Sequence, residues 1–138
     1  MMNTKQLSVL IAEDEPDVLA VMARRLTEAG FRAIPVPDGG AACEHLASEV
    51  PDIMVLDVNM PCKSGFEVLG ELRSLPAEKL GNRWVPVIIV SAQGELEDMR
   101  RGFDLLADHY LVKPCKMEDL VNAVNLMAGL IPLRVLPA

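Results

Sequence analysis

The chain has 138 residues, 51% of them hydrophobic, and its 13 basic and 20 acidic side chains give a net charge of −7. This composition excludes a disordered protein, and the negative charge argues against nucleic-acid binding by this domain alone. No stretch approaches the roughly 20 apolar residues of a membrane span, and the N-terminus does not have the pattern of a signal peptide. The three cysteines are widely spaced and indicate neither zinc nor a disulfide framework, so we expect reduced thiols and a cytoplasmic location.

Short apolar runs and helical patterns alternate from the start of the chain. A strand is predicted near residues 7–12, and Pro16 suits the first position of the helix that follows. A weaker strand near residues 31–36 contains Pro35, which confines that strand to an edge of a sheet. Asp38 then provides an N-cap for a second helix.

The second half of the chain continues this alternation. A third strand ends at Asp57, and Ser64 with Glu67 has the spacing of a capping box at the start of a third helix. The segment from residue 74 to residue 84 is predicted to be a loop. The remaining expected elements are a strand near 85–90, a helix with inward-facing Leu96, Met99, Phe103 and Leu106, a strand near 109–112, and a helix over about 116–129.

This order of elements predicts a (βα)5 fold of the α/β class, a doubly wound five-stranded parallel sheet of the flavodoxin-like type. Right-handed crossovers place helices on both faces of such a sheet, which explains why the strands read as continuous apolar runs. An edge position for the second strand fits the strand order 2-1-3-4-5. We expect one domain over residues 7–129, an N-terminal extension over 1–6, and a tail or the start of a linker over 130–138.

Polar side chains directly follow four of the predicted strands. They are Glu13 and Asp14, then Asp57, Ser91 and Lys113. In parallel α/β sheets the binding crevice lies at the carboxyl ends of the strands, so these side chains should converge there. Three neighbouring carboxylates need a compensating cation, and a set of oxygen ligands without histidine or thiolate favours Mg²⁺ or Mn²⁺. One carboxylate can then act as a nucleophile toward a phosphoryl group whose charge the metal and the lysine neutralise.

Four short motifs stand at these strand ends, in the order Leu10-Ile11-Ala12-Glu13-Asp14-Glu15, Asp57-Val58-Asn59-Met60-Pro61 with Gly65, Ser91-Ala92, and Tyr110-Leu111-Val112-Lys113-Pro114. Together they resemble the receiver domain of bacterial two-component response regulators. The resemblance covers about residues 7–128, which is nearly the whole chain.

The resemblance implies a role for each acidic residue. Asp57 would accept a phosphoryl group from the phosphohistidine of a sensor histidine kinase or of a phosphotransfer protein. Asp14 and Asp57, with the backbone carbonyl of Asn59, would hold the metal ion, while Glu13 would act mainly through a bound water. The side chain of Asn59 would also tune the lifetime of the phospho-aspartate.

The same resemblance assigns roles to the residues after the fourth strand and around the fifth. Lys113, followed by a cis peptide bond, would pair with the phosphoryl oxygens, and Ser91 would donate its hydroxyl to one of them. Ala92 would keep access to the phosphoryl group open, and Gln93 would help to set its lifetime. Tyr110 would turn inward on phosphorylation and so act with Ser91 as the switch.

The implied function is a phosphorylatable signalling switch that catalyses only its own phosphorylation and dephosphorylation. Phosphorylation would repack the surface formed by the fourth helix, the fifth strand and the fifth helix. The partners expected at this surface are a downstream protein, an output domain outside this sequence, or a second copy in a phosphorylation-dependent homodimer. No direct contact with nucleic acid or membrane is expected.

Two other functions remain open from the sequence. A phosphatase of the haloacid-dehalogenase type also uses a phospho-aspartate, Mg²⁺ and a lysine, but its nucleophile lies on the first strand with a second aspartate two residues later, whereas position 59 here is asparagine. A receiver-like binding module that is not phosphorylated is the other alternative. Turnover of a generic phosphomonoester would indicate the phosphatase, and failure to label Asp57 would indicate the inert module.

The chain departs from the family pattern at four places. Glu13 replaces the commoner aspartate and has a longer reach. Leu106 stands where most members have a glycine, so the turn before the fifth strand is expected to differ. Cys115 stands in place of a larger apolar residue, and the loop over residues 75–84 is longer than usual. None of these changes removes a group that the proposed chemistry needs.

Overall fold

A computed structural model describes residues 6–92 and 96–131 of the chain. The strands are β1 (Ser8–Ala12), β2 (Arg32–Val36), β3 (Ile53–Asp57), β4 (Val87–Ser91) and β5 (His109–Val112). The helices are α1 (Pro16–Glu28), α2 (Gly39–Ser48), α3 (Gly65–Arg73), α4 (Leu96–Asp104) and α5 (Met117–Leu130). Most of the expected extension and tail, and the predicted site residue Gln93, lie outside the described residues. Among the described helices, none is long and apolar enough to cross a membrane.

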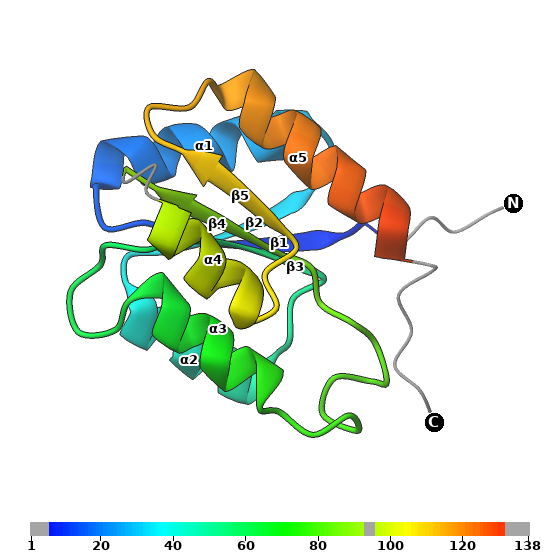
Figure 1. The fold of residues 1–138 in the computed structure, drawn as a ribbon. Coiled ribbons are helices and arrows are strands. Elements are labelled where there is room, and N and C mark those ends of the chain that lie inside the picture. The colour runs from blue at the N-terminus through cyan, green and yellow to red at the C-terminus, as the bar shows by residue number, and fades with distance from the viewer. Residues whose placement is uncertain (1–5, 93–95, 132–138) are drawn as a thin grey trace, which may run out of the picture.

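The five strands form one parallel sheet in the order β2-β1-β3-β4-β5, which confirms the predicted fold. Helices α1 and α5 cover one face of the sheet, and α2, α3 and α4 cover the other (Figure 1). The strand that contains Pro35 is an edge strand, as its missing N–H requires. This order brings the carboxyl ends of β1 and β3 together at the point where the chain changes direction across the sheet.

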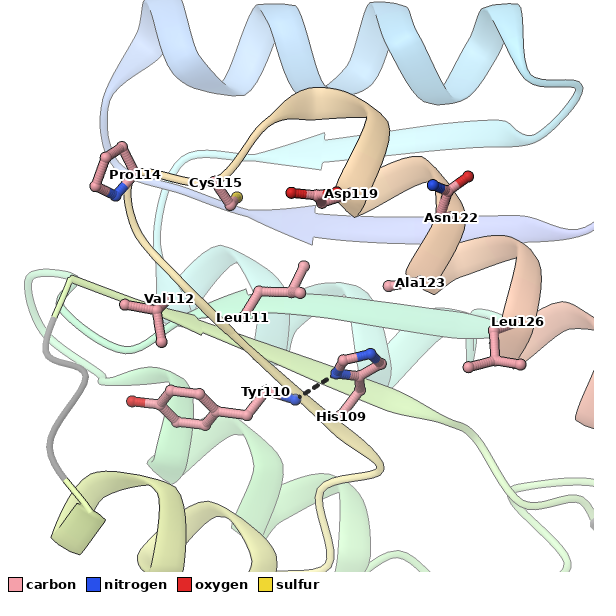
Figure 2. A pocket seen from close by; sticks show the side chains of 10 residues that line it. All are labelled: His109, Tyr110, Leu111, Val112, Pro114, Cys115, Asp119, Asn122, Ala123 and Leu126. Carbon is pink, nitrogen blue, oxygen red and sulfur yellow. Dashed lines mark hydrogen bonds between the residues drawn. The ribbon is translucent and has the colours of Figure 1, made fainter.

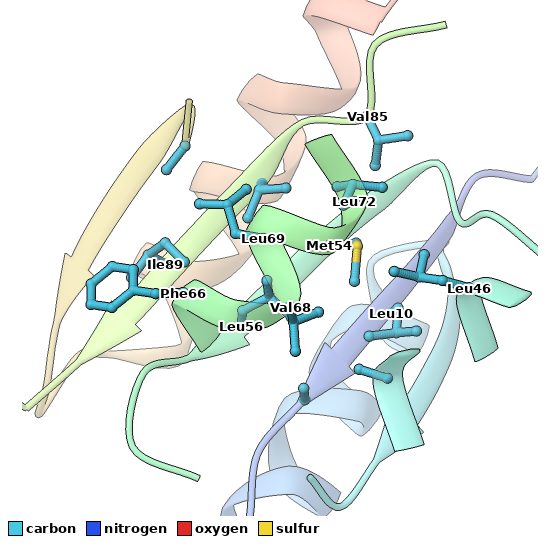
Figure 3. Packing of buried hydrophobic residues seen from close by; sticks show 14 of the residues in the cluster. Leu10, Leu46, Met54, Leu56, Phe66, Val68, Leu69, Leu72, Val85 and Ile89 are labelled. Atoms are coloured by element: carbon cyan, nitrogen blue, oxygen red, sulfur yellow. The ribbon is translucent and has the colours of Figure 1, made fainter. Parts of the chain in front are cut away.

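A hydrophobic cluster fills each face of the sheet. Because successive strand residues point to opposite faces, Leu10 belongs to the cluster under α2 and α3, while Val9 and Ile11 belong to the cluster under α1 and α5. Figure 3 shows the first cluster, in which Leu69 and Leu72 of α3 pack over β3 and β4. Since β1, β3 and β4 are buried along their whole length, polar side chains are confined to the strand ends.

The predicted helix caps are present. An Asp38 carboxylate oxygen accepts a hydrogen bond from the Ala41 amide at 2.8 Å, and the Ser64 hydroxyl accepts one from the Glu67 amide at 3.2 Å. These caps fix where α2 and α3 begin, and both starting points lie at the edge of the sheet where β1 and β3 end.

The prediction for α4 was wrong in part. Phe103 and Leu106 are 47% and 53% exposed, whereas Gly102 and Ala107 are buried and Met99 is half-buried. Gly102 faces the rings of Phe66 and Tyr110 on the inner side of the helix, and the helix ends at Asp104, before Leu106. The periodicity therefore predicted too long a helix and placed the wrong side chains on its inner face.

The turn before β5 has a left-handed residue at the position where the sequence departs from the family pattern. Leu106 has a φ of 68°, the left-handed conformation that a glycine adopts without strain. The backbone here thus has a conformation that favours glycine, although a leucine occupies the position. Its carbonyl oxygen accepts hydrogen bonds from Arg73 Nε at 3.1 Å and from Nη2 at 2.9 Å.

Two buried aspartates organise the opposite edge of the sheet, where the strands begin. Asp52 accepts hydrogen bonds from the Ser8 amide at 2.8 Å and from Arg83 Nη1 at 2.5 Å. Asp108 accepts hydrogen bonds from Arg73 Nη2 at 3.1 Å, from the Trp84 indole at 3.0 Å, and from the Val87 amide at 2.9 Å. These contacts hold the long loop between α3 and β4 at the edge away from the acidic cluster.

Candidate metal centre at the carboxyl edge of the sheet

Three carboxylates meet at the ends of β1 and β3. The ligand oxygens of Glu13, Asp14 and Asp57 all lie within 4.8 Å of one another. Glu13 and Asp57 are 1% and 4% exposed, because each directly continues or ends a strand buried on both faces, whereas Asp14 is exposed. The cluster therefore has a buried floor and an open side, and the sequence predicted this meeting correctly.

Lys113 reaches the same cluster from the end of β5. Its Nζ lies 2.7 Å from Glu13 Oε1 and 3.2 Å from Asp57 Oδ2. The Lys113 amide donates a hydrogen bond to the Ser91 carbonyl at 2.7 Å, and the Lys113–Pro114 peptide bond is cis, as expected. A side chain that is 56 residues from Asp57 in the sequence thus becomes its charged neighbour.

Three carboxylates beside one ammonium leave an excess of negative charge, which appears in the pKa values. Burial, together with the charge of Glu13, raises the pKa of Asp57 to about 6, although Lys113 opposes the shift. Burial also raises the pKa of Glu13, but hydrogen bonds from Lys113 and the Glu15 amide outweigh it and leave this pKa lowered. Partial burial and the hydrogen bond with Glu13 raise the pKa of Asp14. The ammonium lies closer to Glu13 than to Asp57, and Asp57 is the carboxylate whose pKa remains raised.

This donor set fits a hard divalent cation. The described residues supply only oxygen ligands here, and the exposed Asp14 leaves room for waters that Mg²⁺ retains. A bound cation would add the positive charge that the cluster lacks. Asn59, whose carbonyl the sequence suggested as a ligand, is exposed in the loop directly after β3.

Of the other predicted site residues, Ser91 and Ala92 lie at the same edge of the sheet, and Tyr110 lies within β5 beside Ile89. Ser91 is fully buried at the end of β4, next to the residue pair Asp57 and Val90 that joins β3 to β4, and Ala92 follows it at the surface. Tyr110 is 8% exposed within β5. The direct ion pair between Glu13 and Lys113 was not predicted. No sequence signal indicates it, because the sequence suggested only a phosphoryl partner for the lysine.

A groove runs along the outer edge of β5, between this strand and α5 (Figure 2). His109 lies at one end, and its Nδ1 accepts a hydrogen bond from the Tyr110 amide at 2.8 Å. Exposed Val112 and Leu126 line the groove from the strand and the helix, respectively. Lys113 directly follows the last residue of β5. The strand that lines the groove therefore leads into the acidic cluster.

Comparisons with known proteins agree with this geometry. The sequence profile of the response regulator receiver domain matches residues 9–125. The transcriptional regulatory protein PrrA of Mycobacterium tuberculosis is 37% identical over 117 residues, which make up 85% of this chain and 48% of PrrA. Response regulator RR06 of Streptococcus pneumoniae is 35% identical over 119 residues, which make up 86% of this chain and 52% of RR06. The chain thus spans about half the length of these relatives.

Solved structures give the same result. The receiver domain of the Francisella response regulator 1452 matches with a TM-score of 0.79 and 28% identity, covering 90% of this chain and 98% of that chain. The chemotaxis response regulator CheY4 of Vibrio cholerae matches with a TM-score of 0.80, covering 89% of this chain and 99% of that chain. Its identity of 24% means that this second match bears on the fold alone.

Proposed function

The chain belongs to the response regulator receiver domain family, and from that premise we propose that Asp57 is the phosphoryl acceptor of a signalling switch. The observation that carries the proposal is the uneven charge compensation at the carboxyl edge of the sheet. Asp57 is 4% exposed, lies 3.2 Å from Lys113 Nζ, and has a pKa near 6, so it is ionised at neutral pH. An ionised carboxylate at the end of a strand is a competent nucleophile.

In the proposed reaction an Asp57 carboxylate oxygen attacks the phosphorus of a phosphohistidine on a sensor kinase or phosphotransfer protein. A bond from this oxygen to phosphorus forms, the phosphorus–nitrogen bond breaks, and its electron pair returns to the imidazole, which takes a proton from solvent. A divalent ion, when held by Asp14, Asp57 and the Asn59 carbonyl, would supply positive charge to the phosphoryl oxygens. The ammonium of Lys113 lies close to Asp57, where it would pair with the oxygens of a phosphoryl group on that residue.

We propose that the switch runs from Ser91 to the outer strand of the sheet. Ser91 ends β4, which pairs with β5, and Tyr110 is in β5 beside Ile89 of β4. A hydroxyl drawn toward a phosphoryl group would change the packing behind it, and Tyr110 is the buried ring on the neighbouring strand. The phosphoryl group would thus bias a two-state element through contacts that exist in only one state.

Partners would read this change at the surface formed by α4, β5 and α5. The surface already exposes apolar side chains, namely Phe103, Leu106, Val112 and Leu126. Apolar groups of this size at the surface favour a protein partner, such as a downstream protein, an output domain or a second copy. The roles of Ala92 and Gln93 in phosphoryl access and lifetime belong to the same proposal.

The test is to incubate the protein with acetyl phosphate and Mg²⁺, with and without EDTA, and to record the intact mass. We expect one phosphoryl adduct that requires the metal and is absent from Asp57→Asn. The matched control is Asp17→Asn, the same change at an exposed aspartate in the first turn of α1, which should label like the wild type. An unlabelled wild type, or a labelled Asp57→Asn, would contradict the proposal and favour an inert binding module.

A further inference from the structure

The loop between β3 and α3, residues 58–64, has an unusually constrained backbone. Its ends are tied together by a hydrogen bond from the Gly65 amide to the Val58 carbonyl at 3.2 Å. Within it, the Lys63 amide donates to the Pro61 carbonyl at 2.8 Å, and Cys62 has a φ of 70°. A side chain at positive φ persists only where the surrounding structure determines the backbone. Contacts with residues outside the loop therefore determine its backbone conformation.

Helix α2 provides that hold at Gly39, its first residue. A Cβ atom placed on Gly39 would lie 2.3 Å from the Lys63 carbonyl oxygen and 2.7 Å from the Lys63 Cβ. Backbone atoms cannot move aside as the end of a flexible side chain can, so only glycine allows the loop to rest here. The next residue is different, because a Cβ on Gly40 would meet nothing closer than Asp38 Oδ1 at 3.4 Å.

Side chains from two helices reinforce the same point of the loop. Lys63 Nζ donates to Glu71 Oε1 of α3 at 2.5 Å. Burial and the hydrogen bond with Glu71 raise the pKa of the Cys43 thiol of α2 to about 11, so this thiol remains protonated beside the pair. The lysine and the glutamate are 36% and 48% exposed, and exposed ion pairs contribute little. The backbone contact with Gly39 is therefore the main constraint.

We propose that Gly39 is a positioning residue for the metal centre, acting through the backbone of Lys63 on the carbonyl of Asn59. The inference rests on the proposed function, which assigns that carbonyl to the metal. Only Met60, Pro61 and Cys62 separate Asn59 from Lys63. Proline fixes its own φ, and Cys62 is held in the left-handed region, so two of the three intervening residues have restricted backbones through which a displacement at Lys63 reaches Asn59.

The other end of the loop is seated in the same way. A Cβ on Gly65 would lie 2.4 Å from the carbonyl oxygen of Asp57. The loop is thus pressed against α2 at one side and against the end of β3 at the other. Figure 1 shows α2 and α3 side by side on one face of the sheet, with this loop leading into α3. Both glycines serve one purpose, which is to fix the loop relative to the acidic cluster.

The test compares Gly39→Ala with Gly40→Ala, the same substitution at adjacent positions in the first turn of α2. Both variants also carry Gly70→Ala in α3, where an added methyl group meets nothing within 4 Å and improves helix propensity. Mn²⁺ binding to the unphosphorylated protein is measured by electron paramagnetic resonance. We expect Gly39→Ala to bind about tenfold more weakly, the size of effect seen when groups behind metal ligands are changed, and Gly40→Ala to bind like its parent.

Two further readouts separate positioning from folding. In Gly39→Ala the amide resonances of Asn59 and Met60 should shift, and the Mg²⁺ concentration at half-maximal labelling by acetyl phosphate should rise while the rate at saturating Mg²⁺ is largely retained. A folded Gly39→Ala with wild-type Mn²⁺ affinity overturns the inference, as does a Gly39→Ala variant that fails to fold. If the parent itself binds no Mn²⁺, the proposed function fails as well.

Discussion

The two edges of the sheet differ in how fully the charge of their buried carboxylates is compensated. At the amino edge, Asp52 and Asp108 each have an arginine and a backbone amide as donors. At the carboxyl edge, Glu13, Asp14 and Asp57 have, among the described residues, the ammonium of Lys113 as their cationic neighbour. The negative charge of the carboxylates is thus compensated at the amino edge and remains in excess at the carboxyl edge.

This difference distinguishes a structural site from a functional one. Burying an ionised carboxylate is unfavourable unless charge and hydrogen bonds compensate it, so a matched aspartate can stabilise the fold. The carboxyl edge keeps an uncompensated charge that disfavours the folded state, and a divalent cation would relieve it. The excess charge is therefore the strongest indication that this edge binds a ligand.

The largest expected effect on stability comes from removing an arginine that compensates a buried aspartate at the amino edge. Arg73→Ala takes a guanidinium away from the buried Asp108 and from the Leu106 and Val85 carbonyls. We expect the free energy of unfolding to fall by about 3–5 kcal/mol, the cost of removing one partner of a buried pair. Urea unfolding followed by circular dichroism measures this value.

Arg24→Ala is the control for that experiment. Arg24 pairs with Glu28 on the surface of α1, where the two side chains are 80% and 57% exposed. Its loss should lower the free energy of unfolding by no more than about 0.5 kcal/mol. Equal effects of the two substitutions would contradict the assignment of the amino edge as a structural network.

The next effect has the opposite sign. Asp57→Asn should raise the free energy of unfolding of the metal-free protein by about 2–3 kcal/mol at pH 7, since each pKa unit corresponds to about 1.4 kcal/mol. The pKa of Asp57 is about 6 in the folded protein and 3.8 in an unperturbed aspartate, so the folded state binds this proton more tightly. Raising the pH through this interval therefore destabilises the wild type relative to the variant.

The pH dependence of that difference provides its own control. Below about pH 3 the carboxyl is largely protonated in both states, and the advantage of Asp57→Asn should disappear. Above about pH 7 it should be complete and constant. Urea unfolding in EDTA from about pH 3 to about pH 7.5 measures the difference, and a variant that is no more stable than the wild type at about pH 7 would refute the claim of excess charge.

The smallest expected effect concerns the strained turn at the amino edge. Leu106→Gly should raise the free energy of unfolding by about 0.5 kcal/mol, because relief of the left-handed strain slightly exceeds the added freedom of the unfolded chain. Leu126→Gly, the same change at an exposed leucine inside α5, should instead lower it by about 1 kcal/mol. A destabilising Leu106→Gly would mean that the leucine side chain contributes more packing than its exposure indicates.

The carboxyl edge was largely predictable from the sequence, and the amino edge was not. The strands β1, β3 and β4 are continuous apolar runs that end at or directly before a polar residue, and Lys113 follows β5, so parallel topology brings Glu13, Asp57 and Lys113 to one edge. The pairing of Arg73 with Asp108, 35 residues apart, depends on how a long loop folds back, and no periodic pattern encodes it. Distant side-chain pairs of this kind require coordinates.

The same reasoning explains the errors and omissions at α4 and around the loop after β3. Helical periodicity indicated an inward-facing Phe103, but the helix packs through Gly102, a choice that depends on the rings beneath it. The role of Gly39 was not predicted either. Gly39 matters because Lys63 occupies the space that a Cβ atom on this residue would need. A glycine in the first turn of a helix does not by itself indicate such a close approach.

The most direct test of the central claim is the stability of wild type and Asp57→Asn, each measured in EDTA and in saturating Mg²⁺. We predict that the variant is the more stable protein in EDTA, and that Mg²⁺ removes its advantage. A ligand at a hundredfold excess over its Kd should stabilise the wild type by about 2.7 kcal/mol, and the variant, which lacks one carboxylate ligand, by much less. Equal stabilisation of both proteins by Mg²⁺, or of neither, would contradict the account.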